Sequence, residues 1–338
     1  MDNQIALVTG GAGFIGSELV RQLVRRGLRV RAVDNLVNGR RENLEGIVGS
    51  GAELIVADVR DEASMASLIQ GAGLIFHLAC LGARHSIHSP IENHEVNASA
   101  TLGLLKIARS FGVSRFVYVS SSEVYGTARQ VPISEEHTTL PITVYGASKL
   151  AAEGYTRAYW ETYRYPTVVV RPFNAYGPRC HHEGDSGGVI PTFMLRCMAE
   201  KAMVVFGEGT QTRDFTFVSD TAAGILGAGL SPDCVGQTLN LGSGKEIQIR
   251  ELADTVAQVL GRTGSEVTHV EPRPGDVLRL LADSSKARKI LGFEPMVSLK
   301  GGLSQLRDWY VSQGKTAEEF MEEEVVRDGE PRNVASHV

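Results

Sequence analysis

The sequence has little of what marks disulfide-rich, nucleic-acid-binding or membrane proteins. Its four cysteines, Cys80, Cys180, Cys197 and Cys234, lack paired spacing, so we expect reduced thiols in a cytoplasmic protein rather than a disulfide framework or a zinc site. The formal net charge of −5 comes with no basic stripe, which argues against nucleic-acid binding. No apolar run approaches the roughly 20 residues of a membrane helix, and the first predicted strand starts too early to leave room for a signal peptide.

A separating linker is also missing. No internal repeat or low-complexity stretch divides the 338 residues, although this length exceeds what one hydrophobic core usually supports. We therefore expect two lobes in close contact, with a ligand bound in the cleft between them.

A glycine-rich turn near the N-terminus is the first positive signal. Residues 5–9 form a short apolar run, residues 10–16 read GGAGFIG, and a helical pattern then continues to about Gly27. A second apolar run ends at Asp34. This order of strand, turn, helix, strand and acid is typical of a dinucleotide-binding unit.

Each residue type in this unit has a physical role. Gly10 permits the tight turn, Gly13 lets a pyrophosphate approach the backbone N–H groups of the helix N-terminus, and Gly16 lets helix and strand pack closely. The carboxylate of Asp34 can bind both ribose hydroxyls and would repel a 2′-phosphate, so NAD is favoured over NADP. The alternative is a glycine turn used only for packing. The cofactor-binding residues predicted here are Gly10, Gly13, Phe14, Ile15, Gly16, Asp34 and Asn35.

The alternation of strands and helices continues along the first half of the chain. Residues 54–57 and 74–79 are strand-like, and residues 91–110 have helical spacing. Parallel strands joined by helices predict a Rossmann-type, doubly wound α/β sheet with ligands at the carboxyl ends of its strands. His77 lies within an apolar run, where we expect a buried, hydrogen-bonded histidine. The further cofactor-binding predictions are Asp58 and Val59 near the adenine, and Leu78 and Ala79 near the nicotinamide.

The stretch from 116 to 149 carries the predicted chemistry. A buried strand over 116–119 leads into a serine cluster, and Tyr145 and Lys149 open a helix four residues apart, which places them on one face. The Lys149 ammonium should stabilise the phenolate and lower the pKa of Tyr145 from about 10. Tyr145 could then take a proton from a hydroxyl group near neutral pH. The alternative is a surface helix that happens to carry both residues.

With these segments in order, the sequence resembles the extended short-chain dehydrogenase/reductase family, in particular its NAD-dependent nucleotide-sugar epimerases and dehydratases. The resemblance covers about residues 3 to 312. It implies NAD as the cofactor and, as the substrate, a nucleotide-sugar whose nucleotide is UDP, dTDP or GDP. It also implies a homodimer formed through helices over about 91–110 and 144–163. The later motifs that carry it are RPFNAYGPR at 171–179, RDF at 213–215, NLG at 240–242 and RPGD at 273–276.

The resemblance also implies a reaction. Tyr145 would deprotonate the sugar 4-hydroxyl while C4 passes a hydride to NAD, and Lys149 would bind the nicotinamide ribose. A serine, Ser121 or Ser122, would orient the hydroxyl. The 4-ketose so formed has an acidic C5 proton. A 4-epimerase returns the hydride to the other face, a 4,6-dehydratase removes the C5 proton and the 6-hydroxyl, and a decarboxylase loses carbon dioxide.

Glu123 distinguishes these reactions. In similar 4,6-dehydratases a glutamate at this place is the C5 base, whereas many 4-epimerases lack an acid there. Two residues depart from the dehydratase pattern, because Ser121 replaces the usual threonine and Ser122 stands where some dehydratases carry an acidic aspartate. We therefore expect an NDP-hexose 4,6-dehydratase first and a 4-epimerase similar to UDP-glucose 4-epimerase second.

Three further readings stay open. UDP-glucuronate decarboxylases carry a more acidic string at the catalytic tyrosine than the YGASK of residues 145–149, so this activity ranks third. Glu123 could be a solvated acid in a turn. From a different class, the chain could be a non-catalytic NAD-binding sensor, which the intact Tyr145 and Lys149 disfavour.

The second half of the chain is predicted to supply the substrate lobe. We expect a NAD-binding domain over 1–177, to which parts of about 205–245 return, and a smaller α/β nucleotide-sugar-binding lobe over 178–315. The acidic tail over 316–338 is expected to be a solvated helix or a disordered end.

The substrate-binding predictions rest on paired hydrogen bonds and on the resemblance. Arg213 and Arg273 should clamp the diphosphate, unless they form surface ion pairs. No metal is expected, because the histidines and acids between 181 and 185 lack the spacing of a zinc site. The predicted substrate-binding residues are Asn174, Arg179, Val189, Arg213, Arg273 and Asp276.

Overall fold

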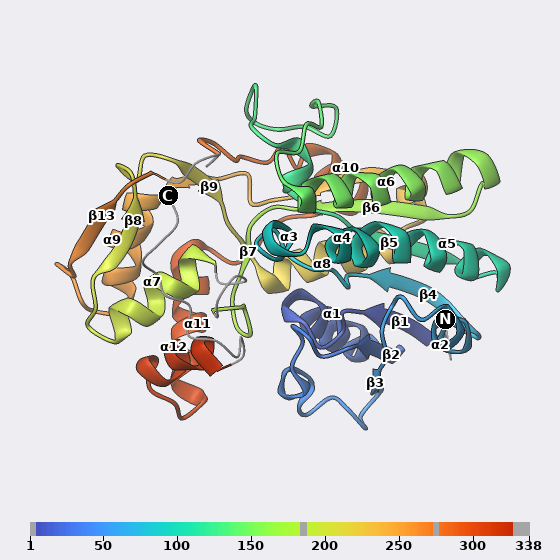
Figure 1. Ribbon diagram of the computed structural model, residues 1–338, viewed down its shortest axis with the longest axis horizontal. Coiled ribbons are helices and arrows are strands. Elements are labelled where there is room, and N and C mark those ends of the chain that lie inside the picture. Colours follow the sequence, from blue (N-terminus) through green and yellow to red (C-terminus); the bar gives the residue numbers. More distant parts are fainter. Residues whose placement is uncertain (1–4, 183–187, 273–276, 327–338) are drawn as a thin grey trace.

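The computed structural model describes residues 5–182, 188–272 and 277–326. Seven parallel strands form one sheet in the order β11-β6-β5-β4-β1-β2-β3 (Figure 1). This sheet confirms the predicted Rossmann-type, doubly wound architecture. The strands are β1 (Ile5–Thr9), β2 (Arg29–Asp34), β3 (Ala52–Val56), β4 (Ala72–His77), β5 (Arg115–Val119), β6 (Thr167–Pro172) and β11 (Thr238–Leu241).

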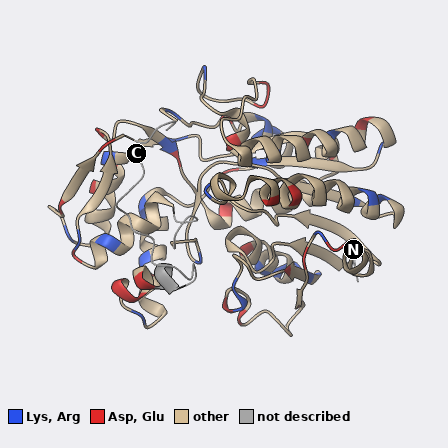
Figure 2. Ribbon diagram, viewed as in Figure 1, with Lys and Arg blue, Asp and Glu red and all other residues tan. Residues whose placement is uncertain are grey.

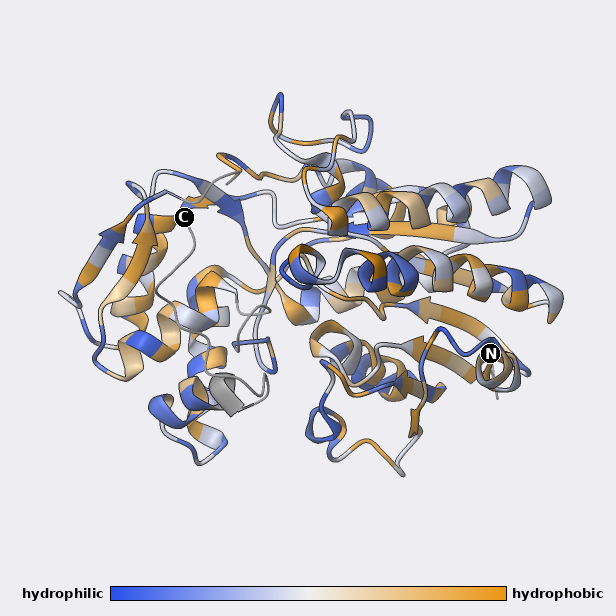
Figure 3. Ribbon diagram, viewed as in Figure 1, coloured by the Kyte–Doolittle hydropathy of each residue, from blue (hydrophilic) through white to orange (hydrophobic). Residues whose placement is uncertain are grey.

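The central strands form because their β-branched and aromatic residues are buried on both faces. All six residues of β6 are buried, and Val117 of β5 pairs with Val168 of β6. Figure 3 shows these strands in hydrophobic colours, beside helices that mix hydrophobic and hydrophilic residues. Continuous apolar runs of this kind are typical of parallel sheets that are covered by helices on both sides.

Helices cover the two faces of the sheet. The core on one face joins the sheet to α1, α8 and α10, and the core on the other joins it to α2, α5 and α6. These helices are α1 (Phe14–Arg25), α8 (Val218–Leu230), α10 (Ser285–Leu291), α2 (Glu62–Ile69), α5 (Ala100–Ser110) and α6 (Val144–Tyr163). Figure 2 shows positions of both charge signs scattered over the ribbon.

The helix predicted over 91–110 is interrupted. Its first part is α4 (Pro90–His94), and a π-helical turn over Glu95–Ser99 precedes α5. The side chain of Asn97 explains the interruption, because its Oδ1 accepts from the Leu81 backbone N–H at 2.8 Å and its Nδ2 donates to the Leu81 carbonyl at 3.0 Å. π-helical turns are frequent at functional sites, and this one fixes the segment that follows β4.

In the residues that the structure describes, the second lobe has its own core and three two-stranded sheets. Its elements are β7 (Ala175–Tyr176), α7 (Val189–Met198), β8 (Met203–Phe206), β9 (Thr212–Asp214), β10 (Thr216–Phe217), β12 (Glu246–Gln248), α9 (Ile249–Val259), β13 (Val267–Val270) and α11 (Leu299–Ser312). The pairs are β7 with β10, β8 with β13, and β9 with β12.

Two elements return from the second half of the chain to the first lobe. Both β11 and α8 lie within the stretch expected to return, and they join the parallel sheet and its helical layer. The domain boundaries themselves stay a prediction. Within the described ranges, no helix is long and apolar enough to cross a membrane.

The acidic tail contributes a packed helix. Residues Ala317–Val326 form α12, which contacts α7 in the second lobe (Figure 1). Ala317 and Phe320 are buried, whereas Glu318, Glu319 and Glu322 are exposed. The first part of the tail is therefore a helix with one solvated face and one packed face.

Candidate active site

A cavity of about 760 Å³ lies at the carboxyl ends of β1, β4 and β5. Residues of both lobes line it, from Gly10 and Leu78 on one side to Val204 and Phe206 on the other. The size falls within the range of small-molecule and cofactor sites, and the position is where doubly wound sheets bind ligands.

The glycine turn after β1 requires glycine for lack of space. A Cβ on Gly16 would lie 2.0 Å from the Gly10 carbonyl oxygen, and Gly10 itself has φ +67° with the Ala79 backbone nitrogen 2.8 Å from its ideal Cβ. A dinucleotide can approach this bare backbone at the N-terminus of α1. The lining includes every predicted residue of this unit, namely Gly10, Gly13, Phe14, Ile15, Gly16, Asp34 and Asn35.

Asp34 lies at the end of β2 with little exposure. Its carboxylate accepts from the Ala12 backbone N–H at 3.0 Å and from the Leu36 N–H at 2.9 Å. Burial raises the pKa of Asp34, and these backbone donors oppose the rise. Neighbouring N–H groups thus hold the carboxylate in place, at the position where a ribose is expected.

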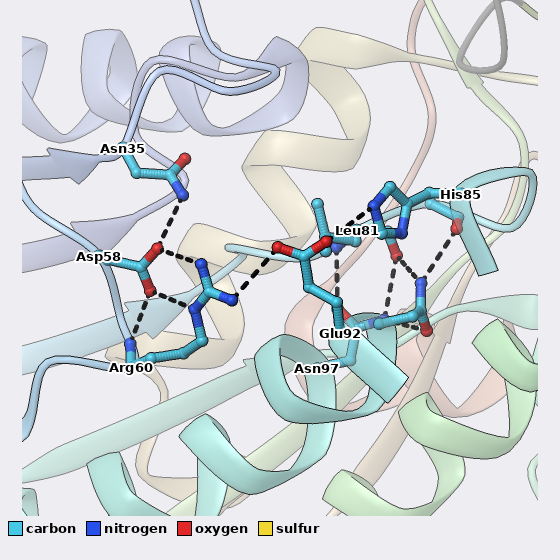
Figure 4. A network of polar contacts seen from close by, with 9 residues as sticks. Asn35, Asp58, Arg60, Leu81, His85, Glu92 and Asn97 are labelled. Atoms are coloured by element: carbon cyan, nitrogen blue, oxygen red, sulfur yellow. Dashed lines mark hydrogen bonds and ion pairs between the residues drawn. The ribbon is translucent and has the colours of Figure 1, made fainter. Parts of the chain in front are cut away.

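A polar network continues this wall (Figure 4). Asp58 accepts from Arg60 at 2.8 Å and from the Asn35 side-chain amide at 3.1 Å, so the pKa of Asp58 is well below its usual value. Arg60 also pairs with Glu92 at 3.2 Å, and Glu92 lies 3.3 Å from His85. The cavity lining contains Val59 and Arg60 but not the carboxylate-bearing Asp58. The structure therefore places Arg60, which the sequence argument missed, nearer the cavity than Asp58.

Leu78 and Ala79 line the cavity, as does the adjacent Cys80. His77, just before them, is buried as expected. Its Nδ1 lies 2.6 Å from the Thr9 hydroxyl and its Nε2 lies 2.9 Å from the Thr101 hydroxyl. Burial, together with the nearby Lys149 charge, lowers the pKa of His77 to about 3, so this histidine is neutral near pH 7 and links β4 to Thr9 and Thr101.

Tyr145 and Lys149 lie in the first turns of α6, and both line the cavity. The helix starts here because the Thr143 hydroxyl accepts from the Gly146 N–H at 3.0 Å, which is a standard N-cap. The ammonium of Lys149 is 6.0 Å from the centroid of the Tyr145 ring and donates to the Val119 carbonyl at 2.8 Å.

The predicted lowering of the Tyr145 pKa is contradicted by the structure. Burial raises the pKa of Tyr145, Cys80 and Glu123 add to the rise, and a hydrogen bond with Ser121 opposes it. Lys149 does not compensate, because burial lowers its own pKa and its ammonium is directed at a backbone carbonyl. Four-residue spacing places two side chains on one face but does not fix where their polar ends point.

Ser121, Ser122 and Glu123 follow β5 and line the cavity beside Tyr145. The Ser121 hydroxyl accepts from the Glu123 N–H at 3.1 Å and begins the short helix η3 (Ser122–Tyr125). The Glu123 charge adds to the rise in the pKa of Tyr145, so the two groups interact electrostatically at the same cavity. The structure thus brings together all five predicted catalytic residues.

A buried ion-pair network lies behind these residues. Arg171 of β6 donates to Glu153 of α6 at 2.9 and 2.6 Å and to the Tyr125 hydroxyl of η3 at 2.8 Å. Tyr125 in turn donates to Asn240 of β11 at 2.7 Å. The network joins the helix of Tyr145 to the turn of Glu123. Within this network, the residue that the sequence could have indicated is Glu153, because it continues the four-residue spacing of Tyr145 and Lys149.

The predicted substrate residues divide into three groups. Asn174, Val189 and Arg213 line the cavity, where the Arg213 guanidinium also donates to the Val277 carbonyl at 2.6 Å. Arg179 is not in the lining, because it pairs with Glu18 of α1 at 2.7 Å. Arg273 and Asp276 lie outside the described residues.

The polar loop after β7 holds one further lining residue. His181 lines the cavity, whereas His182 is buried against aromatic rings. Glu183 and Asp185 lie outside the described residues. In the part of the chain that is described, no three histidines, cysteines or acids group closely enough to hold a metal ion.

A dinucleotide-binding turn beside a Tyr-x-x-x-Lys centre with strand-end serines defines a site of the short-chain dehydrogenase/reductase class. The family model of GDP-mannose 4,6 dehydratase matches residues 7–306. The chain belongs to this family of NAD-dependent nucleotide-sugar epimerases, dehydratases and decarboxylases within the extended short-chain dehydrogenases/reductases.

Similar proteins represent several reactions. A UDP-glucose 4-epimerase from Mycolicibacterium smegmatis is 36% identical over 309 residues, which cover 90% of this chain and 97% of that protein. UDP-glucuronic acid decarboxylase 1 from Xenopus tropicalis is 34% identical over 311 residues, covering 90% and 71%. A dTDP-glucose 4,6-dehydratase from Streptomyces venezuelae, solved with NAD, has a TM-score of 0.86 at 31% identity, covering 95% of this chain and 99% of that one.

NAD is the cofactor, in agreement with such NAD-bound structures. The residues present fit it, because bare glycine backbone faces the cavity at the start of α1 and a hydrogen-bonded carboxylate ends β2. The specific reaction is a separate question, which the residues around Tyr145 address.

Proposed function

We propose that the protein oxidises a nucleotide-sugar at C4 and, as a 4,6-dehydratase, removes water across C5 and C6. The observation that carries this proposal is the grouping of Tyr145, Ser121 and Glu123 at one cavity. Glu123 supplies a carboxylate to the cavity that Tyr145 lines, and the C5 proton of an oxidised sugar needs such a base. A 4-epimerase has no need of this base.

The first step uses the residues at the start of α6. Tyr145 takes the proton of the sugar 4-hydroxyl, and Ser121, which is hydrogen-bonded to Tyr145, orients that hydroxyl. NAD, when bound, supplies the acceptor for the C4 hydride and later returns it. To accept this proton, Tyr145 must start as the phenolate. The Lys149 ammonium, 6.0 Å from the centroid of the Tyr145 ring, favours that form but does not by itself offset the burial that raises the pKa, and NAD would add positive charge to the site when bound.

The second step uses Glu123. The C4 ketone makes the C5 proton acidic, Glu123 takes that proton, and the C6 hydroxyl leaves as water with a proton from Glu123 or Ser122. Return of the hydride to C6, with a proton from solvent added at C5, completes a 4-keto-6-deoxy sugar. The substrate loses one molecule of water overall, and the cofactor ends in its starting redox state.

A 4-epimerase is the second candidate. Relatives with this activity cover nearly the whole chain, and Ser122 stands where a dehydratase with a separate acid carries aspartate. In that case the hydride returns to the opposite face of C4, and Glu123 takes no part. The decarboxylase relative makes loss of carbon dioxide a third outcome to look for.

Mass spectrometry of products formed from UDP-, dTDP- and GDP-linked sugars in heavy water tests the proposal. We expect a loss of 18 mass units before isotope correction, the mass of one water molecule, together with deuterium in the sugar. An isomer of unchanged mass without deuterium would make the protein a 4-epimerase. Failure of every nucleotide-sugar to reduce the bound cofactor would favour the sensor reading.

Matched variants assign the role of Glu123. Glu123→Gln should lower dehydration by about 10²–10⁴-fold, the usual contribution of a general base, while formation of the 4-ketose continues. Glu136→Gln, which removes an exposed carboxylate from the same region of the chain, is the control and should dehydrate normally. Tyr145→Phe should stop oxidation itself. Dehydration by Glu123→Gln at the parent rate would show that another group is the base.

The family-based homodimer is also a proposal. Leu102 of α5 and Tyr163 of α6 are partly exposed, and these two helices lie side by side in one layer. Light scattering should give the mass of two chains, and a mass of one chain would contradict the dimer.

A further inference from the structure

Helix α12 is the structural feature that the family match does not cover. The family model ends at residue 306, whereas α12 runs from Ala317 to Val326. The helix contacts α7 (Figure 1). Among the side chains of α12 that the structure describes, that of Phe320 is the most buried, with 3% exposure, and it belongs to the core of the second lobe.

The ring of Phe320 lies in an aromatic cluster with α11 and the loop after β7. It meets Tyr310 of α11 with centroids 5.0 Å apart at 70°, and His182 of the loop at 5.2 Å and 88°. His182 and Tyr310 are themselves 6.0 Å apart. Edge-to-face contacts at these distances are favourable beyond the burial of area, so the three rings fix the position of His182.

His182 joins this cluster to the wall of the cavity. The preceding residue, His181, lines the cavity, and its carbonyl accepts from the Gly188 N–H at 3.4 Å. Gly188 is the N-cap of α7. Ile190 and Phe193, in the first turns of α7, line the cavity and belong to the same core as Phe320. One side chain of α12 therefore supports both His181 and the first turns of α7.

We propose that Phe320 is a positioning residue for the sugar-nucleotide end of the cavity and that α12 is part of the substrate-binding machinery. Phe320 acts through His182 and α7 and touches no reacting atom. The proposal rests on the proposed nucleotide-sugar substrate. The cofactor end lies on the carboxyl ends of β1, β2 and β4, whose core does not contain Phe320. Phe14 and Ile15 also touch the core of the second lobe, but the ring contacts of Phe320 are with His182 and Tyr310. A change at Phe320 should therefore weaken substrate binding with little effect on NAD binding.

The test compares three full-length variants that carry NAD. Phe320→Ala removes the ring, and Phe320→Leu keeps an apolar side chain without the edge-to-face contacts. Glu322→Ala changes an exposed residue of the same helix and is the control. For each variant, KM and kcat are measured with the nucleotide-sugar that the parent converts, and the dissociation constant of NAD is measured separately.

We expect the KM of Phe320→Ala to rise about tenfold, within the roughly 100-fold effect that a misplacement near 1 Å can have. Phe320→Leu should lie between it and the parent, and neither the NAD dissociation constant nor the control should change. A parent-like KM in Phe320→Ala would overturn the proposal. An equal weakening of NAD and substrate binding would also overturn it, because that outcome indicates a general loss of structure.

Hydrogen exchange separates this inference from the proposed function. The amides of α7 should exchange faster in Phe320→Ala than in the parent, while those of β1 and β4 stay protected. This comparison needs no turnover. If the parent converts no nucleotide-sugar, the proposed function is wrong. If the amides of α7 exchange equally fast in the parent and in Phe320→Ala, Phe320 does not hold α7 in place, whatever the function.

Discussion

The buried pair of Glu153 and Arg171 offers a sharp test of how the site is held together. The Glu153 side chain has 0% exposure and that of Arg171 has 3%. Two guanidinium nitrogens of Arg171 donate to Glu153 at 2.9 and 2.6 Å, and Arg157 adds a third contact at 2.7 Å. Glu153→Gln would leave the Arg171 charge buried without a counter-ion.

The expected cost follows from desolvation. Removal of one partner of a buried pair destabilises a protein by about 3–5 kcal/mol, which is a large part of a typical unfolding free energy of roughly 5–15 kcal/mol. Arg157→Met is the control. The Arg157 side chain is 42% exposed, so its loss should cost about 0–1 kcal/mol. The double variant with Glu153→Gln and Arg171→Met should recover most of the loss, since no uncompensated charge remains.

Urea denaturation measures these differences directly. The reasoning would be refuted if Glu153→Gln lowered the free energy of unfolding by less than about 1 kcal/mol. It would also be refuted if the double variant lost as much unfolding free energy as the two single variants together. The parent should also weaken in acid. Burial pushes the pKa of Glu153 up, but hydrogen bonds and charge from Arg171 outweigh burial and leave it below its ordinary value of 4.5. A depressed pKa contributes stability above 4.5, and this contribution is lost as the pH falls through the lower folded value; Glu153→Gln should lack this part of the acid sensitivity.

Two predictions concern the cofactor. Asp34→Asn should weaken NAD binding by about 10–100-fold, the usual range for hydrogen bonds to a charged group, and should reduce the preference for NAD over NADP. Titration of both cofactors into the variant measures the two dissociation constants. An unchanged ratio of these constants would show that Asp34 does not bind the ribose. Gly16→Ala should abolish NAD binding, because its Cβ would lie 2.0 Å from the Gly10 carbonyl oxygen. Gly27→Ala, in a turn with open space, is the control for loss of a glycine and should keep NAD, although its positive φ will cost stability.

Much of the fold could be predicted because its signals are local. Each strand of the first lobe is a short apolar run, and the glycine turn, the Asp34 carboxylate and the Tyr145–Lys149 spacing are each visible within a few residues. Strand, turn and helix patterns of this kind are enough to specify a doubly wound sheet and the edge at which it binds ligands.

The tertiary structure decided which partners these residues have. Arg179 pairs with Glu18, which is 161 residues away in the chain, and Asn97 interrupts its own helix to bind the backbone of Leu81. Burial, rather than the neighbouring lysine, sets the pKa of Tyr145. Partner choice and desolvation depend on the packing of remote segments, and local spacing contains no information on them.

The sequence by itself therefore determined the class of fold, the cofactor and the residues around which the chemistry is arranged, because each depends on the order of residues along a short segment. Only the tertiary structure brought Glu123 to the cavity that Tyr145 lines and packed Phe320 of the acidic tail under the substrate wall. The contact of Phe320 with His182 joins segments 138 residues apart, and its energy comes from burial that exists only once the chain has folded.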